Sequence, residues 1–242
     1  MTVHGDLTRF AEIDGSAQQF ALQNSKLLKI SLQHGPVQAK MGSMVAYQGD
    51  ATFENKGSGG LGKMMKKAMT NEGVEMMEVK GNGEVFLADQ AYDVLVIYLE
   101  NDTVSINGKN ILAFSSSINW DINRVGGGMA GAMAGGLYNV VLSGSGFVAI
   151  STDGTPVSLD VASAPTFGDP QAVVMWSGGV QMKVKTDTTG GLKSMARGGT
   201  GETFQMAFSG QGFVLVQPSE GALFGPGGGS SGGGLLNNLM GS

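Results

Sequence analysis

The sequence predicts a mainly β protein: three tandem β-sandwich-like repeats in a pseudo-threefold arrangement, with short Gly- and Met-rich helical or loop inserts. A Gly-x-Gly motif flanked by alternating apolar residues occurs three times, at Met77–Leu87, Val140–Ile150 and Met206–Val216. The copies lie roughly 65 residues apart, a longer period than that of a simple solenoid. Glycine supplies 41 of the 242 residues and charged residues only 14%, which favours closely packed strands joined by tight turns.

These repeats predict one triplicated β domain over residues 1–218. Its repeats span about residues 22–88, 89–152 and 153–218. Residues 219–242 read as a flexible Gly/Ser-rich tail that ends in the apolar tip Leu235–Met240. The tail is expected to be a disordered terminus or a short docking peptide on a tether.

In the first repeat, Leu27–Leu32 reads as a strand that ends at His34-Gly35-Pro36, and residues 45–53 read as a pair of strand segments. A Gly/Lys/Met-rich loop over residues 57–73 precedes the first Gly-x-Gly motif. Each motif predicts a hairpin turn, because glycine readily adopts the positive φ that a two-residue turn requires.

The second repeat restarts with the apolar strand Val94–Leu99, and Asn107-Gly108 predicts a type I′ turn. The remaining expected strands cover residues 111–114, 118–122, 157–161, 173–176 and 180–184. Three aromatic residues, Tyr47, Phe114 and Trp176, occupy equivalent places in the three repeats. The repeats therefore align beyond their glycine motifs.

Composition limits the classes of function. The formal net charge is −5, whereas a nucleic-acid-binding protein normally carries a basic face. The chain has no cysteine, which excludes disulfides, thiolate metal ligands and cysteine nucleophiles. His4 and His34 are the only histidines, too few for a histidine metal site, and no cofactor is expected. Residues 1–6 show no signal-peptide pattern, so a cytoplasmic location is expected, with peripheral membrane contact left open.

One segment imitates a phosphate-binding loop. Gly57–Lys63 fits the Gly-x-x-x-x-Gly-Lys pattern, but the next residue is Met64 where a Ser or Thr hydroxyl should ligate magnesium. The sequence around it also has no βαβ pattern. A nucleotide site is therefore not expected here.

Several motifs together resemble a known family. They are Gly59–Lys67 running on to Glu72, Gly81–Val85, Gly191–Met195, Gly198–Glu202 and Phe208–Pro218. The chain resembles the mitochondrial-biogenesis family named for altered inheritance of mitochondria, which often has Pro where this chain has Asn82. The resemblance implies a triplicated β-sandwich similar to the tryptophan RNA-binding attenuator fold, homo-oligomers, and no established catalytic residues.

A glycine-flanked insert precedes each Gly-x-Gly motif, and the three inserts are rich in methionine. If the repeats are related by pseudo-threefold symmetry, the insert tips emerge on one side and form an apolar surface with a basic rim, which is typical of a protein or membrane contact. The alternative is that the inserts are lids with methionine as gap filler. The expected contact residues are Met64, Met65, Met69, Met129, Met133, Leu192, Met195, Lys63, Lys66 and Lys67, with Lys193 and Arg197 on the rim.

The sequence thus favours a non-enzymatic, oligomeric β-scaffold or binding module. Its expected partners are other copies of itself and a protein or membrane surface, with nucleic acid not expected. The alternative is a small-ligand-binding or catalytic β-sandwich with a pocket between repeats, lined by Tyr47, Phe114 and Trp176. Aromatic residues at repeat-equivalent positions usually fill a core.

Overall fold

The computed structural model describes residues 8–55, 75–124, 138–186 and 204–219. In these ranges the chain is mainly β, with three single-turn 3-10 helices, η1 (Thr8–Phe10), η2 (Leu32–His34) and η3 (Gly108–Asn110). The strands are β1 (Phe20–Asn24), β2 (Leu27–Ser31), β3 (Val37–Lys40), β4 (Met44–Glu54), β5 (Met76–Leu87), β6 (Asp93–Asn107), β7 (Ile111–Ser115), β8 (Asn119–Arg124), β9 (Tyr138–Thr152), β10 (Val157–Asp160), β11 (Thr166–Gly168), β12 (Val173–Ser177), β13 (Val180–Thr186), β14 (Phe204–Gly210) and β15 (Phe213–Val216).

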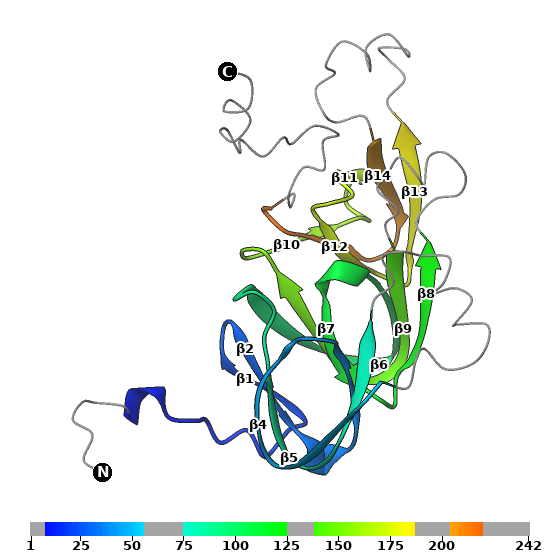
Figure 1. Cartoon of the computed structure of the whole chain (residues 1–242). Coiled ribbons are helices and arrows are strands. Elements are labelled where there is room, and N and C mark those ends of the chain that lie inside the picture. The colour runs from blue at the N-terminus through cyan, green and yellow to red at the C-terminus, as the bar shows by residue number, and fades with distance from the viewer. Residues whose placement is uncertain (1–7, 56–74, 125–137, 187–203, 220–242) are drawn as a thin grey trace, which may run out of the picture.

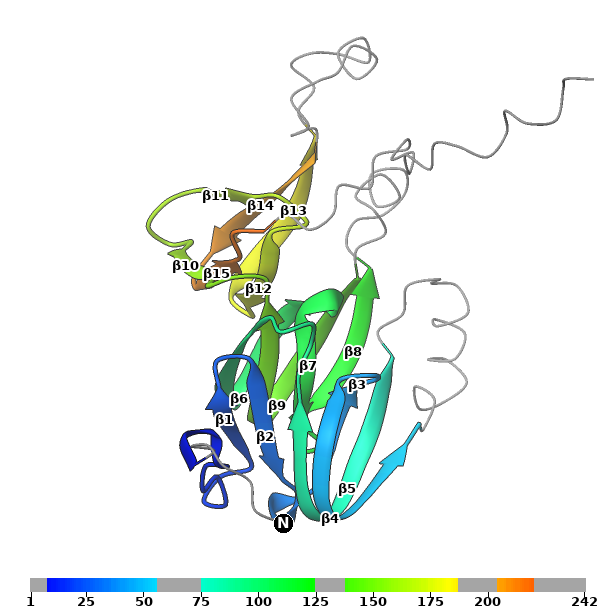
Figure 2. The ribbon, with the colours of Figure 1, turned by 60° about the vertical axis from the view of Figure 1, so that its left-hand side comes forward.

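Among the described strands, every pairing is antiparallel. The larger sheet follows the path β1-β2-β5-β3-β7-β9-β6-β12-β15-β10, with β4 added to β5 and β8 added to β9. The smaller sheet has the order β11-β14-β13. Figures 1 and 2 show the first strands at one end of the molecule and β10 to β15 at the other, with β6 to β9 between them. The mainly β prediction is confirmed.

The glycine motifs are not hairpin turns, so that prediction is wrong. Gly81-x-Gly83 lies inside the continuous strand β5, Gly144-x-Gly146 lies inside β9, and the third motif separates β14 from β15. Each motif is a corner at which the chain bends and continues forward. At Gly81, φ is +142° and an added Cβ would lie 2.1 Å from the carbonyl oxygen of Asp50. Glycine is needed because the neighbouring backbone passes too close for a side chain.

Two further local predictions are corrected. Asn107-Gly108 is not a type I′ turn: Asn107 is the N-cap of η3, and its Oδ1 accepts a hydrogen bond from the Lys109 amide at 3.3 Å. Asparagine before glycine suits both structures, because its side chain can bond the backbone ahead of it. Residues 45–53 belong to one long strand, β4, in place of the two predicted segments. The strand Leu27–Leu32 is confirmed as β2, which ends at Ser31.

Each third of the chain arranges its strands in the same order. A leading strand (β2–β3, β6 or β10–β11) pairs with one edge of a closing strand (β5, β9 or β14–β15). A middle strand (β4, β7–β8 or β12–β13) pairs with the other edge. The names first, second and third unit are used below for residues 20–87, 93–152 and 157–216.

The registers also match from unit to unit. The aromatic residue of each middle strand lies opposite a valine two residues after the second glycine of the corner. These pairs are Tyr47 with Val85, Phe114 with Val148 and Trp176 with Val214. Each middle strand has one register irregularity just before that residue, between Met44 and Ala46, Ile111 and Ala113, and Val173 and Met175.

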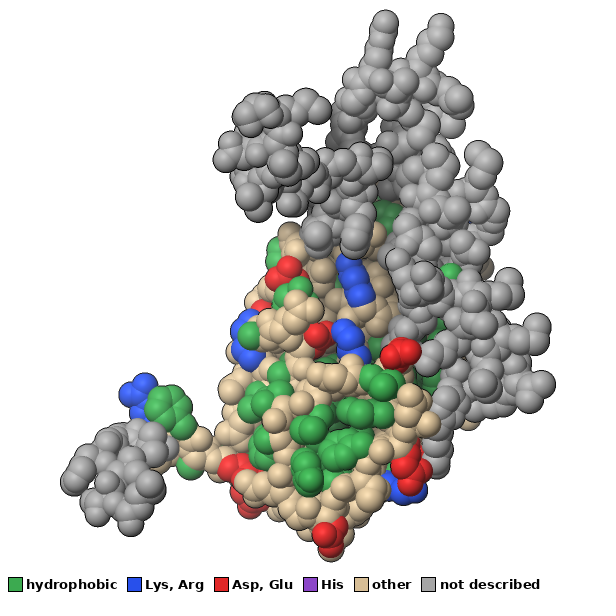
Figure 3. All heavy atoms as spheres, viewed as in Figure 1, with side chains coloured by type: hydrophobic (Ala, Val, Ile, Leu, Met, Phe, Trp, Pro, Cys, Tyr) green, Lys and Arg blue, Asp and Glu red, His purple; other side chains and the backbone are tan. Residues whose placement is uncertain are grey.

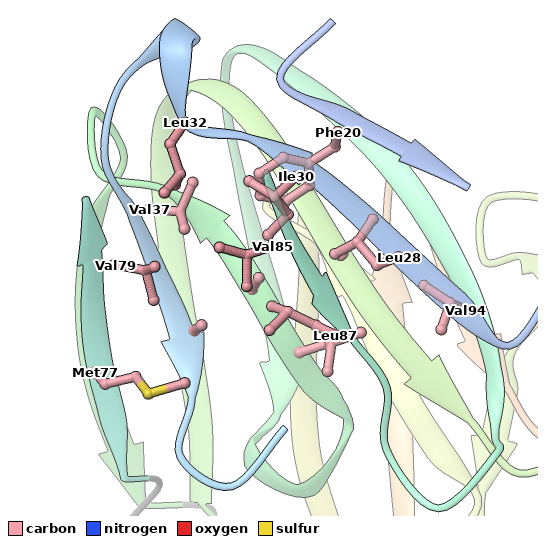
Figure 4. Packing of buried hydrophobic residues seen from close by; sticks show 14 residues of the cluster. Phe20, Leu28, Ile30, Leu32, Val37, Met77, Val79, Val85, Leu87 and Val94 are labelled. Carbon is pink, nitrogen blue, oxygen red and sulfur yellow. The ribbon is translucent and has the colours of Figure 1, made fainter. Parts of the chain in front are cut away.

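The buried apolar residues form three clusters. The first, drawn in Figure 4, lies in the first unit but includes four residues of the second: Val94, Leu112, Ala113 and Ala149. The second lies in the second unit and includes Met76 of the first unit and Val174 and Met175 of the third. The third cluster draws its described residues from the third unit alone. The described buried residues therefore form three separate clusters and no single core.

Candidate interaction surface

The ten contact residues expected from the sequence lie outside the described residues. They are Met64, Met65, Met69, Met129, Met133, Leu192, Met195, Lys63, Lys66 and Lys67. The strands on either side of each insert are described, and in each unit they pair with one another: β4 with β5, β8 with β9, and β13 with β14. Each insert therefore connects two adjacent antiparallel strands, which agrees with the alignment of the inserts in the sequence.

An exposed apolar strand lies in the first unit. The first part of β4, Met44–Gln48, is exposed throughout, with Val45 60% and Tyr47 50% exposed. The Tyr47 ring stacks edge-on against Phe53, with 5.4 Å between centroids. Figure 3 shows hydrophobic side chains gathered where Figure 1 draws β4 and β5. Met44–Gln48 is called the open β4 arm below.

The equivalent strands of the other two units are buried. In β7, Leu112 and Phe114 are both 0% exposed, and in β12, Val174 is 0% and Trp176 7% exposed. Phe114 packs against Trp120 at 6.0 Å between ring centroids. Strands with the same register therefore differ sharply in exposure.

The neighbouring unit explains this burial. Strand β7 pairs along its outer edge with β3 of the first unit, and β12 pairs in the same way with β6 of the second unit. These two contacts are called joints below. In each joint, a middle strand is covered by the leading strand of the unit before it. The open β4 arm belongs to the first unit and has no such strand beside it among the described residues.

The leading strand of the third unit also has an open edge. Strand β11, Thr166–Gly168, pairs with β14 on one side, and no other described strand pairs with it. Its central residue, Phe167, is 48% exposed, with the Lys185 ammonium 4.8 Å above its ring. Thr166–Gly168 is called the β11 edge below. Exposed strand edges can template pairing with another chain, so proteins usually cover or charge them.

A polar network holds the three units in place. Lys40 binds the Asp89 carboxylate at 2.6 Å and the Lys109 carbonyl at 3.1 Å. Asn110 of the second unit donates from Nδ2 to the side chain of Gln217, the residue directly after the third unit, at 3.0 Å. Burial lowers the pKa of Lys109, despite nearby carboxylates that favour its charge. This network positions the units relative to each other.

A second charged group lies beside the open β4 arm. Lys29 on β2 is almost fully buried and bonds to Glu12 at 2.5 Å and Glu84 at 2.9 Å. Burial opposes the ammonium charge, but the two carboxylates outweigh it and raise the pKa of Lys29. The hydrogen bond from Lys29 lowers the pKa of Glu12. Glu84 lies opposite Gln48, so this group lies beside the last residue of the open β4 arm.

The family described as Mitochondrial biogenesis AIM24 matches residues 20–219. The chain belongs to this family. The crystal structure of a Streptococcus pyogenes protein is also similar, with a TM-score of 0.66 and 22% identity over 83% of this chain and 92% of that chain. At this identity the likeness shows the fold alone. No curated protein matches the chain.

The AIM24 match begins at β1 and ends just after β15, so it spans all three units. The resemblance drawn from the glycine and insert motifs is thereby confirmed. Within the described ranges, no three His, Asp or Glu residues group as metal ligands, and no helix is long and apolar enough to span a membrane. His34 is exposed, and its Nε2 lies 2.7 Å from the Ser16 carbonyl oxygen.

Sequence reasoning placed Tyr47, Phe114 and Trp176 together as possible pocket residues in this AIM24 chain. The structure places Phe114 and Trp176 in packed cores and leaves Tyr47 half-exposed. The sequence analysis did not single out the open β4 arm or the β11 edge. One signal was present: the middle strand of the first unit carries Tyr where the others carry Phe and Trp, and tyrosine suits a surface that is partly wet.

Proposed function

We propose that this AIM24-family chain is a non-enzymatic, oligomeric β-scaffold made of three copies of one β-sandwich-like unit. Copies of the chain associate through exposed strand edges. The assembled scaffold then docks a protein partner or a membrane surface through its Met-rich inserts.

The repeated registers support the triplication. In all three units the leading and middle strands flank the closing strand, and the aromatic residue lies at the same distance from the glycine corner. A serine supports two corners in the same way: Ser115 Oγ accepts from the Phe147 amide at 3.0 Å, and Ser177 Oγ accepts from the Phe213 amide at 3.1 Å. A pseudo-threefold arrangement additionally requires a third joint, between the third unit and the first.

The observation that carries the oligomeric part is the exposure of the open β4 arm. Burying a large apolar side chain stabilises a protein by about 1.5–3 kcal/mol. The equivalent strands β7 and β12 bury their apolar side chains inside one chain and gain this stabilisation, whereas Val45 and Tyr47 of β4 remain exposed and do not. An apolar strand with an open edge favours association with another strand.

Sizing of the full chain tests this part directly. Light scattering or mass photometry at micromolar concentration should report species at multiples of 24.9 kDa. The fraction in larger species should fall on dilution. A strictly monomeric chain over this range would contradict the scaffold.

The insert surface requires a separate test. The triple variant Met64→Gln, Met65→Gln, Met133→Gln should keep the unfolding midpoint of the parent, because glutamine is similar in length and polar. It should bind anionic liposomes or the partner protein more weakly, as the apolar contact is lost. Met41→Gln, at a 37% exposed methionine outside the inserts, is the matched control. If the triple variant binds as the parent does, the inserts act only as lids and the docking proposal is wrong.

The non-enzymatic part is a prediction from the sequence, and a thermal-shift screen of metabolites and nucleotides tests it. A reproducible rise in the unfolding midpoint with one compound class would favour the alternative, a ligand site between repeats. The packing of Phe114 and Trp176 into filled cores favours the scaffold over that alternative.

A further inference from the structure

We infer that the open β4 arm of one chain pairs, antiparallel and head to tail, with the β11 edge of a second copy. This inference rests on the proposed oligomeric function and names the surface that performs it. The first observation is the pairing rule of the two joints. In each of them, the outer edge of a middle strand is covered by the leading strand of the preceding unit. The segments that cover a middle strand are β3 and the end of β6, and of the described segments at this position in the three units only their equivalent β11 covers none.

The register of the new joint follows from the other two. Val37 lies opposite Ser115 in the first joint, and Val104 lies opposite Ser177 in the second. Val37, Val104 and Thr166 are equivalent, because each pairs with the residue two before the first corner glycine: Val79, Leu142 and Phe208. Ser115, Ser177 and Gln48 are equivalent, because each follows the aromatic residue of its middle strand. Thr166 therefore lies opposite Gln48, Phe167 opposite Tyr47, and Gly168 opposite Ala46.

The side chains at these positions suit a contact. Phe167 is 48% and Tyr47 50% exposed, and the proposed register makes them a direct cross-strand aromatic pair. Directly opposite aromatic residues on neighbouring strands stabilise the pairing. The two exposed aromatic rings therefore cover one another in the joint.

The cores point to the same contact. The core of the first unit includes Leu112 and Ala113 from the following unit, and the core of the second includes Val174 and Met175. The core of the third unit contains no described residue from another unit. The equivalent residues of a second copy are Val45 and Ala46, which lie on the open β4 arm and would complete that core.

The two edges cannot meet within one chain as it is folded here. Figures 1 and 2 both place β4 and β11 at opposite ends of the molecule. A contact between different surfaces of identical copies is heterologous, so it repeats from copy to copy and forms a ring or a filament. The joint thus continues from chain to chain the pairing that already links the units inside each chain.

Cysteine cross-linking tests the register, because the chain has no cysteine of its own. Gln48→Cys and Thr166→Cys are prepared as separate single variants of the full chain, mixed in equal amounts and mildly oxidised. In-register strands bring the two Cα atoms within about 7 Å, the limit for a disulfide. The expected product is a linked dimer with one chain of each variant, identified by intact mass, well above either variant oxidised alone.

The matched control moves one cysteine along the same strand. Ala46→Cys mixed with Thr166→Cys places the thiols two residues out of register, and the yield should fall by about tenfold because the Cα separation exceeds the disulfide limit. Equal yields from both mixtures would overturn the inference. The inference would also be overturned if the parent chain forms oligomers but the Gln48→Cys and Thr166→Cys mixture gives no linked dimer. In that case the scaffold proposal stands, and its interface lies elsewhere. A parent chain that is monomeric throughout would overturn both proposals.

One further variant separates a second copy from closure within the chain. The double variant Gln48→Cys, Thr166→Cys should form a ladder of linked multimers at micromolar concentration. A linked product with the mass of one chain would instead show that the first and third units meet in the same molecule. That result would overturn pairing with a second copy and support a closed pseudo-threefold arrangement.

Discussion

Strand β7 and the open β4 arm have the same register against their closing strands and opposite exposure. Phe114 of β7 is 0% exposed, whereas Tyr47 of the β4 arm is 50% exposed. The difference comes from the strand at the outer edge: β3 covers β7, and no described strand covers the β4 arm. Burial in this fold is therefore decided by the joint between units as well as by the residues of each unit.

The largest expected difference is in core truncation. Phe114→Ala should lower the free energy of unfolding by about 3–5 kcal/mol, since it leaves a cavity in a packed core. Tyr47→Ala should lower the stability of the dissociated chain by only about 1 kcal/mol, because half of its surface is already in water. Urea unfolding at low protein concentration measures both. Equal losses would mean that the β4 arm is covered within the single chain.

The second comparison concerns the glycine corners of the first and second units. Gly81 and Gly144 both have positive φ, at +142° and +120°, so alanine should cost about 1–3 kcal/mol at either position. A Cβ at Gly81 would also lie 2.1 Å from the Asp50 carbonyl oxygen, whereas the nearest atom at Gly144 is 3.9 Å away.

Gly81→Ala should therefore lower the free energy of unfolding by about 1–3 kcal/mol more than Gly144→Ala, which is the usual cost of overpacking. Urea unfolding of the two variants isolates the close backbone approach from the backbone conformation. If both lose the same stability, the corner of the first unit opens at little cost and the spacing of β4 from β5 is not fixed.

The third and smallest effect separates charge from packing beside the open β4 arm. The pKa of Glu12 lies below its ordinary 4.5 because Lys29 donates a hydrogen bond to it. A lowered folded-state pKa contributes stability that is present above pH 4.5 and is lost as the pH falls through the folded value. Since the Glu12 side chain is 32% exposed, the loss should not exceed about 1 kcal/mol.

Glu12→Gln should flatten this acid limb of the stability profile between pH 3 and 8, a range in which Lys29 stays charged. The raised pKa of Lys29 keeps its contribution constant until the pH rises above 10.5. Urea unfolding from pH 3 to 8 gives the profile. An acid limb that stays as steep in the variant would assign the pH dependence to other carboxylates.

The fold class could be predicted from the sequence because strand periodicity and glycine spacing are local signals. The alternation around Tyr47, Phe114 and Trp176 predicted three corresponding middle strands, and their registers agree with that alignment. The corners were misread because glycine with positive φ serves a hairpin turn and a strand bend alike. The alternation continues on both sides in either case, and only the pairing partner distinguishes them.

The joints could not be read from the sequence. Val37 meets Ser115 across 78 positions of the chain, and nothing in the two segments marks the contact. The exposure of the β4 arm follows from a missing joint, so it was hidden for the same reason. The expected insert surface lies outside the described residues and remains a prediction.

Sizing of one matched pair of variants tests the central claim, that the open β4 arm is where copies of this chain associate. Tyr47→Lys adds a charge to the arm, and Tyr98→Lys adds the same charge at a 58% exposed tyrosine on β6, which is not a strand of the proposed joint. Mass photometry should find the parent and Tyr98→Lys at multiples of 24.9 kDa and Tyr47→Lys at 24.9 kDa alone. If Tyr47→Lys assembles as the parent does, with an unchanged unfolding midpoint, the arm is not the interface.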